Sequence, residues 1–178
     1  MKRLLALALF SSVAATPALA ALKVGAAAPD FSAQASLAGK PFAFSLSQSL
    51  KKGPVVLYFF PAAFTSGCTI EAHLFADAAA DYAKLGATLI GVTAGNINRV
   101  AEFSTSECRS KFAVAADPGA KIAKRYDSTI PLMGVSDRTS YVIAPSGKVI
   151  LSFTDMKPDQ HVAKTMDAVK SWRAAHPL

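Results

Sequence analysis

The sequence has few cysteines, with only Cys68 and Cys108 among its 178 residues. They do not form a Cys-x-x-Cys pair, because Thr65 stands where the first cysteine of such a pair would be. This absence argues against a dithiol oxidoreductase, whose chemistry needs two neighbouring thiols. A permanent structural disulfide is an open alternative, since across a loop of this length it stabilises a fold by about 4 kcal/mol in the chain-entropy model.

Charge and histidine are also sparse. The formal net charge is +7, and it falls to +5 if Lys2 and Arg3 are removed with an N-terminal leader. No run of Lys and Arg is interleaved with aromatic residues, so we expect no nucleic-acid partner. The histidines, His73, His161 and His176, lack metal-ligand spacing with one another or with the cysteines. We therefore interpret them as surface or packing residues and expect no metal site.

Residues 1–20 have the layout of a secretory signal peptide, with a basic start, an apolar run and small residues that end at Ala20. The apolar run is too short for a comfortable membrane span. We expect cleavage after Ala20 and export, to a bacterial periplasm, without stable membrane association. The remaining residues, 21–178, have the size and composition of one globular domain and contain no internal repeat or linker.

Apolar runs bounded by Pro and Gly predict strands that alternate with helices. The run Pro54–Pro61 is typical of a central strand buried on both faces. From Ile70 apolar residues recur at helical spacing until Gly86, with Glu71 in the expected first turn. The order predicts a thioredoxin-like α/β fold, a three-layer α/β/α sandwich with a mixed central sheet. The other predicted elements are an irregular entry over 24–30, strands over 40–46, 88–93, 112–115, 140–144 and 148–153, and helical segments that begin at Asn96 as a cap, at Ala120 and at Pro158.

The segment Pro61–Cys68 connects the predicted central strand to its helix. It therefore lies at the carboxyl end of a parallel sheet, where open α/β sheets place their sites. Cys68 falls in or beside the first helical turn, where free backbone N–H groups and the helix dipole favour an anion such as a thiolate. Thr65 is placed as a helix cap or turn hydroxyl, and Pro61 directs the chain as it leaves the strand, although turn chemistry alone accounts for either residue singly.

Pro61, Thr65 and Cys68 together match the signature of the peroxiredoxin family, which reads Pro, three residues, Thr, two residues, Cys. The entry residues Ala28–Phe31, the strand VVLYFFP and the stretch Arg138–Ile143 also resemble their counterparts in that family. The resemblance covers essentially the whole chain after residue 20. It is strongest to the bacterioferritin-comigratory, or Q-type, branch, whose members are reduced by thioredoxin-like proteins.

The resemblance implies a thiol-dependent peroxidase that reduces hydrogen peroxide and organic hydroperoxides without metal or organic cofactor. It gives Cys68 the peroxidatic role, Pro61 and Thr65 supporting roles, and Arg138 the role of a cation that stabilises the thiolate. A guanidinium suits this role because it stays charged and offers several donors. Glu71 is placed to bond this arginine or the backbone, and a favourable first-turn charge is an equally good interpretation.

A sulfenic acid on Cys68 must be resolved by another thiol. Many relatives carry a resolving cysteine five residues after the reactive one, where this chain has His73. Some relatives place it on the helix near whose end we expect Cys108, so we expect an intramolecular disulfide, recycled by a thioredoxin-like reductant, in a monomer or weak dimer. A one-cysteine peroxidase resolved by an external thiol and a non-catalytic module with a structural disulfide stay open as alternatives. A cysteine hydrolase is not supported, because no His or Asn has the sequence context that such an enzyme needs beside its cysteine.

Overall fold

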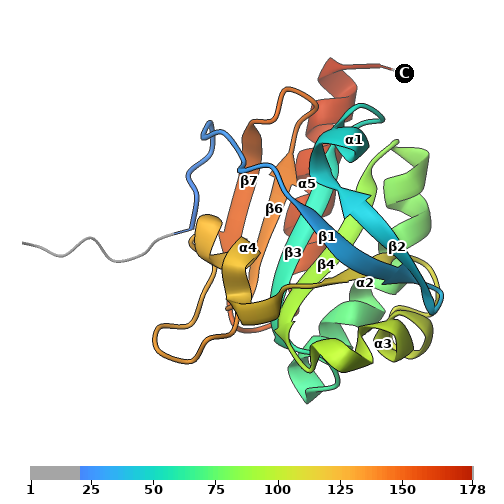
Figure 1. Cartoon of the computed structure of the whole chain (residues 1–178). Coiled ribbons are helices and arrows are strands. Elements are labelled where there is room, and N and C mark those ends of the chain that lie inside the picture. The colour runs from blue at the N-terminus through green and yellow to red at the C-terminus, as the bar shows by residue number, and fades with distance from the viewer. Residues whose placement is uncertain (1–20, 178) are drawn as a thin grey trace, which may run out of the picture.

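Residues 21–177 are described by a computed structural model, in which strands and helices alternate (Figure 1). The predicted signal peptide, residues 1–20, lies outside the described residues. The strands are β1 (Ser32–Leu37), β2 (Lys40–Ser45), β3 (Val55–Ala62), β4 (Thr88–Gly95), β5 (Ala113–Ala116), β6 (Thr139–Ile143) and β7 (Val149–Thr154). The helices are α1 (Leu46–Leu50), α2 (Ser66–Lys84), α3 (Val100–Ser106), α4 (Lys121–Arg125) and α5 (His161–Ala175), with 3-10 turns η1 (Ile97–Arg99) and η2 (Pro118–Ala120).

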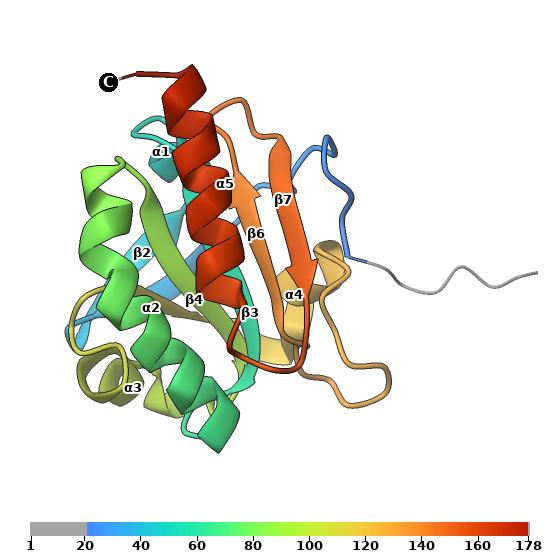
Figure 2. The ribbon, with the colours of Figure 1, turned by 180° about the vertical axis from the view of Figure 1, so that it is seen from behind.

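All these strands belong to one mixed sheet. Its order is β2-β1-β5-β4-β3-β6-β7, with parallel pairing of β3 with β4 and of β4 with β5 and antiparallel pairing elsewhere. Helices α2, α3 and α5 cover one face (Figure 2), and the short α1 and α4 cover the other. The predicted three-layer α/β/α sandwich with a mixed sheet is therefore confirmed.

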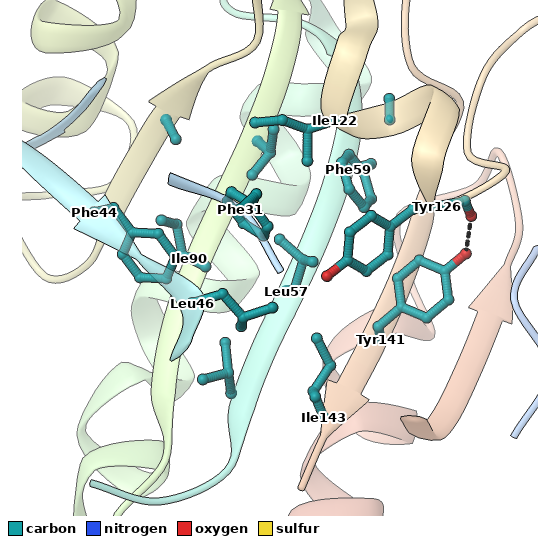
Figure 3. Packing of buried hydrophobic residues seen from close by; sticks show 14 of the residues in the cluster. Phe31, Phe44, Leu46, Leu57, Phe59, Ile90, Ile122, Tyr126, Tyr141 and Ile143 are labelled. Carbon is teal, nitrogen blue, oxygen red and sulfur yellow. Dashed lines mark hydrogen bonds between the residues drawn. The ribbon is translucent and has the colours of Figure 1, made fainter. Parts of the chain in front are cut away.

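Strand β3 forms the centre of the core. Its first six residues are buried, and alternate side chains point to opposite faces of the sheet. Leu57 and Phe59 join the apolar cluster beneath α1 and α4, part of which is drawn in Figure 3. Tyr58 joins the cluster beneath α2, α3 and α5, which also contains Cys68 and Cys108. Both cysteines thus lie in the same apolar layer.

Helix α2 begins earlier than the apolar spacing predicts. It starts at Ser66 rather than at Ile70, with Thr65 in extended conformation as its N-cap. Cys68 therefore lies inside the first turn. Glu71 lies in the second turn and is buried, so its interpretation as a favourable first-turn charge is wrong. Ile70, expected on the buried face, is 49% exposed, because the face of α2 that packs on the sheet carries Cys68, Glu71, Ala72, Phe75, Ala76 and Tyr82 instead.

The sequence pattern predicts neither β1 nor α1, because β1 consists mostly of small residues and α1 is a single short turn. The last helix begins at His161 rather than at Pro158, since the three residues before it form a turn. The irregular entry, the edge strand β2, the hairpin β6–β7 and the end of α2 beside Gly86 are confirmed to within a few residues.

Candidate active site

Cys68 lies just after the loop that connects the central strand to a helix. Strand β3 ends at Ala62, a short loop follows, and α2 begins at Ser66, so Cys68 stands in the first turn of α2. The thiol is nearly enclosed, with 1% of the residue exposed. Backbone N–H groups in the first turn of a helix have no partner within the helix, and they favour negative charge nearby.

Thr65 and Pro61 shape the loop that leads to Cys68. The Oγ1 hydroxyl of Thr65 donates to the carbonyl of Ala62 at 3.1 Å and makes no capping bond with the helix. Of the two roles expected for it, helix cap and turn hydroxyl, it therefore has the second. Pro61 is half-buried near the end of β3, and its carbonyl accepts a bond from the Thr93 hydroxyl at 3.2 Å. These bonds attach the loop to both β3 and β4.

Asn96 anchors the same loop from the turn after β4. It occupies the predicted N-cap position, at the start of η1, but its backbone is left-handed with φ of 53° and its side chain makes no capping bond. Its Nδ2 instead donates to the Ala63 carbonyl at 2.8 Å. One residue further, Phe64 has a φ of 65°, and the Arg99 guanidinium lies 3.8 Å above its ring. The loop thus keeps an unfavourable backbone conformation because two contacts hold it.

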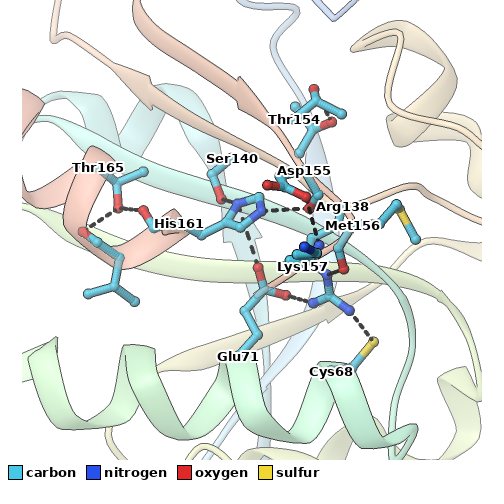
Figure 4. Close-up of polar contacts among 12 residues, drawn as sticks. Cys68, Glu71, Arg138, Ser140, Thr154, Asp155, Met156, Lys157, His161 and Thr165 are labelled. Carbon is cyan, nitrogen blue, oxygen red and sulfur yellow. Dashed lines mark hydrogen bonds and ion pairs between the residues drawn. The ribbon is translucent and has the colours of Figure 1, made fainter. Parts of the chain in front are cut away.

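Arg138 brings a buried positive charge to the cysteine (Figure 4). Its Nη2 donates to Cys68 Sγ at 3.6 Å, its Nη1 is paired with Oε2 of Glu71, and its Nε donates to the Met156 carbonyl at 3.0 Å. Gly67 leaves room for this arrangement, because a Cβ at that position would lie 3.0 Å from Nη2. The guanidinium is therefore fixed at three nitrogens, with one of them aimed at the sulfur.

Glu71 links this arginine to a second buried group, His161. The Nε2 of His161 lies 2.8 Å from the Asp155 carbonyl, which can only accept, so Nε2 carries the proton. In the neutral ring Nδ1 then accepts from the Ser140 hydroxyl at 2.8 Å. The same Nδ1 lies 3.7 Å from Oε1 of Glu71, an oxygen with no hydrogen-bond partner among the described residues.

Burial controls the charge of this cluster. It raises the pKa of Glu71 to about 8, although the Arg138 guanidinium acts in the opposite direction. Burial also lowers the pKa of His161, which keeps its ring neutral. When Glu71 is protonated, the positive charge of Arg138 is available to a thiolate at Cys68. His161 belongs to this network although its sequence position, in the final helix, carries no signal of it.

Cys108 follows the end of α3, as predicted, and is fully buried. Burial raises the pKa of its thiol far above the ordinary range, and nearby Glu107 acts in the same direction. Both cysteines are free thiols in the structure. Cys108 as described is thus a protonated, enclosed thiol and a poor nucleophile.

Within residues 21–177, no group of three or more His, Cys, Asp or Glu side chains is arranged to hold a metal ion. The histidines fall in separate places: His73 bonds Glu107, His161 packs inside the core, and His176 is exposed near the C-terminus. Across the same described range, none of the helices combines the length and apolarity that a membrane span requires.

Known proteins resemble this chain over most of its length. Residues 24–152 match the AhpC/TSA family. A chloroplastic peroxiredoxin Q of rice, Oryza sativa subsp. japonica, is 32% identical over 149 residues, which cover 83% of this chain and 66% of that protein. The chain spans 59% to 66% of the length of the rice, Populus jackii and wheat proteins that it matches.

Solved structures agree with this result. The crystal structure of peroxidoxin BcpB from Mycobacterium tuberculosis has a TM-score of 0.76 and 28% identity, and the match covers 84% of this chain and 97% of that one. The 2-Cys peroxiredoxin of Plasmodium vivax has a TM-score of 0.75 at 21% identity, over 87% of this chain and 99% of that one, and thus shares the fold.

Proposed function

The chain belongs to the AhpC/TSA family and is similar to peroxiredoxin Q proteins, and we propose that it is a thiol-dependent peroxidase in which Cys68 is the peroxidatic residue. The observation that carries this proposal is the contact of Arg138 Nη2 with Cys68 Sγ in a nearly enclosed first helical turn. A fixed cation beside a cysteine favours the thiolate, which is the nucleophilic form.

The proposed reaction begins with attack of the Cys68 thiolate on the terminal oxygen of a hydroperoxide. The S–O bond forms as the O–O bond breaks, and the leaving hydroxide or alkoxide takes up a proton to become water or an alcohol. The sulfur is oxidised to a sulfenic acid and the peroxide is reduced by two electrons. Arg138 donors are placed to stabilise charge on the peroxide oxygens as this bond breaks, while Thr65 and Pro61 hold the loop.

Resolution by Cys108 completes the proposed cycle. The Cys108 sulfur attacks the sulfenic sulfur, a disulfide forms, and the hydroxyl leaves as water with the proton of the Cys108 thiol. A thioredoxin-like dithiol then returns two electrons. The burial of Cys108 favours a second candidate, a one-cysteine cycle in which an external thiol resolves Cys68 directly, because Cys108 must leave the core before it reacts.

The cellular setting is proposed from the first twenty residues, whose basic start, apolar run and small-residue ending support export to a bacterial periplasm. The plant relatives are named as chloroplastic proteins. A monomer or weak dimer stays our prediction.

The test is oxidation of the protein from residue 21 onward with stoichiometric hydrogen peroxide, followed by intact mass and free-thiol counts. We expect one internal disulfide in the wild type, a sulfenic acid in Cys108→Ser, and no reaction in Cys68→Ser. If Cys108→Ser with an added thiol still turns over at the wild-type rate, the two-cysteine cycle is excluded and the one-cysteine cycle is supported. If Cys68 of the wild type does not react with hydrogen peroxide, the proposed peroxidase function is excluded.

A further inference from the structure

A hydrogen bond and an ion pair from α2 hold the segment that carries Cys108. The Nε2 of His73 lies 2.8 Å from Oε2 of Glu107, and the Nη1 of Arg109 donates to Oδ1 of Asp77 at 2.6 Å. Glu107 and Arg109 are the immediate neighbours of Cys108 in the chain, so each side of the thiol has its own attachment to the helix that carries Cys68.

The pairs fix one register between the two elements. His73 and Asp77 are four residues apart in α2 and therefore lie on the same face of that helix. Glu107 meets the histidine and Arg109 meets the carboxylate. A shift of the segment along α2 that brought Glu107 to Asp77 would place two negative charges together, which is unfavourable.

The segment itself has little other regular structure. The residues between α3 and β5 belong to no helix or strand, so their release breaks no sheet pairing. Arg109 and Ser110 have φ angles of 49° and 59°, a left-handed conformation that residues with side chains rarely adopt. The attachment thus holds a backbone that is strained in its present place.

We propose, on the basis of the function proposed above, that the pairs His73–Glu107 and Asp77–Arg109 form a clamp that keeps Cys108 in the core. Release of this clamp sets the rate at which Cys108 reaches the sulfenic acid on Cys68. No reactant beyond the peroxide is required, because the clamp acts on the position of the thiol and not on the electron balance.

The first experiment measures how often the segment around Cys108 opens, and it uses no peroxide. In a Cys68→Ser background, the rate at which iodoacetamide alkylates Cys108 reports how often the segment opens. Asp77→Asn removes one pair and is expected to raise this rate by about two- to fivefold, the range for partly exposed ion pairs. Asp81→Asn is the matched control, because Asp81 lies one turn further along α2 and pairs with Lys84 at 2.9 Å, away from the segment.

Further variants separate charge pairing from general loosening. Glu107→Gln is expected to have an effect similar to that of Asp77→Asn, and the two together to raise the rate by about tenfold. Exchange of the charges, in Asp77→Arg with Arg109→Asp, is expected to restore the rate toward its starting value. Equal alkylation rates in Asp77→Asn and Asp81→Asn would overturn the clamp.

The second experiment links the clamp to catalysis in the protein with both cysteines. After stoichiometric hydrogen peroxide, we expect Asp77→Asn to speed disulfide formation by the same factor as alkylation, with the oxidation of Cys68 unchanged. Faster alkylation with an unchanged rate of disulfide formation would show that release of the clamp is not the slow step and would overturn that part of the proposal. Absence of any Cys68–Cys108 disulfide in the wild type would instead overturn the proposed resolving role, while the alkylation result still decides whether the clamp exists.

Discussion

The Nη2 nitrogen of Arg138 lies 3.6 Å from the sulfur of Cys68, although 70 positions separate the two residues in the chain. The sheet explains their proximity. Arg138 directly precedes β6, which pairs antiparallel with β3, and the end of β3 leads into the loop before Cys68. Strand pairing in the middle of the sheet therefore brings the cation to the thiol, and the bond of the same guanidinium to Glu71 fixes its direction.

Replacement of this arginine tests its proposed role. We expect Arg138→Met to slow the oxidation of Cys68 by hydrogen peroxide by about 10²- to 10³-fold, the usual loss when a fixed donor to a developing charge is removed. Arg138→Lys should recover part of the rate, since it keeps the charge but not the fork that bonds Cys68 and Glu71 together. The measurement is the second-order rate constant for thiol loss, with the exposed Arg125→Met as control. A rate in Arg138→Met equal to that of the wild type would exclude this role.

The raised pKa of Glu71 predicts a dependence of stability on pH. Burial raises this pKa from 4.5 to about 8, so between these values the folded protein holds a proton that the unfolded chain has released. The resulting stabilisation is complete below about pH 4.5 and is lost as the pH rises to about 8, with a limiting slope of about 1.4 kcal/mol per pH unit for one proton. Glu71→Gln cannot titrate, so the loss of its stability over this range should be smaller than in the wild type.

The stabilities of the wild type and Glu71→Gln are best compared between about pH 7 and 8. The lowered pKa of His161 has the opposite effect, since its contribution to stability is present above its ordinary value of 6.5 and is lost as the pH falls below it. The free energy of unfolding in urea, measured between about pH 7 and 8, therefore changes with pH mainly through Glu71 and little through His161. Glu102→Gln, at an exposed ion pair with Arg99, is the control and should keep the wild-type slope. Parallel slopes for the wild type and Glu71→Gln would contradict the assignment.

Much of the fold was predictable because its strongest signals are local. The apolar run from Pro54 to Pro61, with prolines at both ends, is typical of a fully buried strand, and the apolar spacing after it predicts the covering helix. The helix α2 starts before the first residue of the apolar pattern, because Ser66 and Gly67 carry no apolar signal and the helix there is opened by a backbone bond from the Thr69 N–H to the Thr65 carbonyl. Strand β1 was missed because Ala and Ser fill most of its positions.

The candidate site was predictable only in part, for a similar reason. The loop residues Thr65 and Cys68 are neighbours in sequence, and Arg138 was indicated by family resemblance. His161 and Asn96 reach the site through tertiary packing, the first from α5 and the second from the turn after β4. The contact of His161 with Glu71 and the bond of Asn96 to the Ala63 carbonyl depend on how the elements pack together, which no local pattern specifies.

The Thr65 hydroxyl provides a test of loop position. It donates to the Ala62 carbonyl from an exposed site, so Thr65→Val should change the free energy of unfolding by less than about 1 kcal/mol. The loop that presents Cys68 would nevertheless lose one of its ties, and a displacement of about 1 Å at a reacting atom costs up to about 10²-fold in rate. We expect slower oxidation of Cys68 in Thr65→Val and near wild-type oxidation in Thr65→Ser. Loss of stability in proportion to loss of rate would indicate a structural role alone.

Two buried tyrosines predict opposite responses to the same substitution. The hydroxyl of Tyr82 bonds the Thr165 hydroxyl at 2.7 Å and donates to the Val162 carbonyl at 3.1 Å, so Tyr82→Phe removes two hydrogen bonds and should destabilise the protein by about 1–2 kcal/mol. The hydroxyl of Tyr58 is buried without a hydrogen-bond partner among the described residues, and its ring lies against Gly91, where a Cβ would approach within 2.8 Å of the hydroxyl oxygen.

Tyr58→Phe removes that unpaired hydroxyl and keeps the ring that packs on Phe75, with centroids 4.4 Å apart. Because the desolvation cost of the hydroxyl is not offset by a bond, the substitution should be neutral or stabilise the fold by up to about 1 kcal/mol. Urea unfolding of the two variants side by side measures the contrast. Equal destabilisation by both would mean that Tyr58 has a partner in solution, such as a buried water, and that the layer shared by Cys68 and Cys108 is wetter than its apolar lining implies.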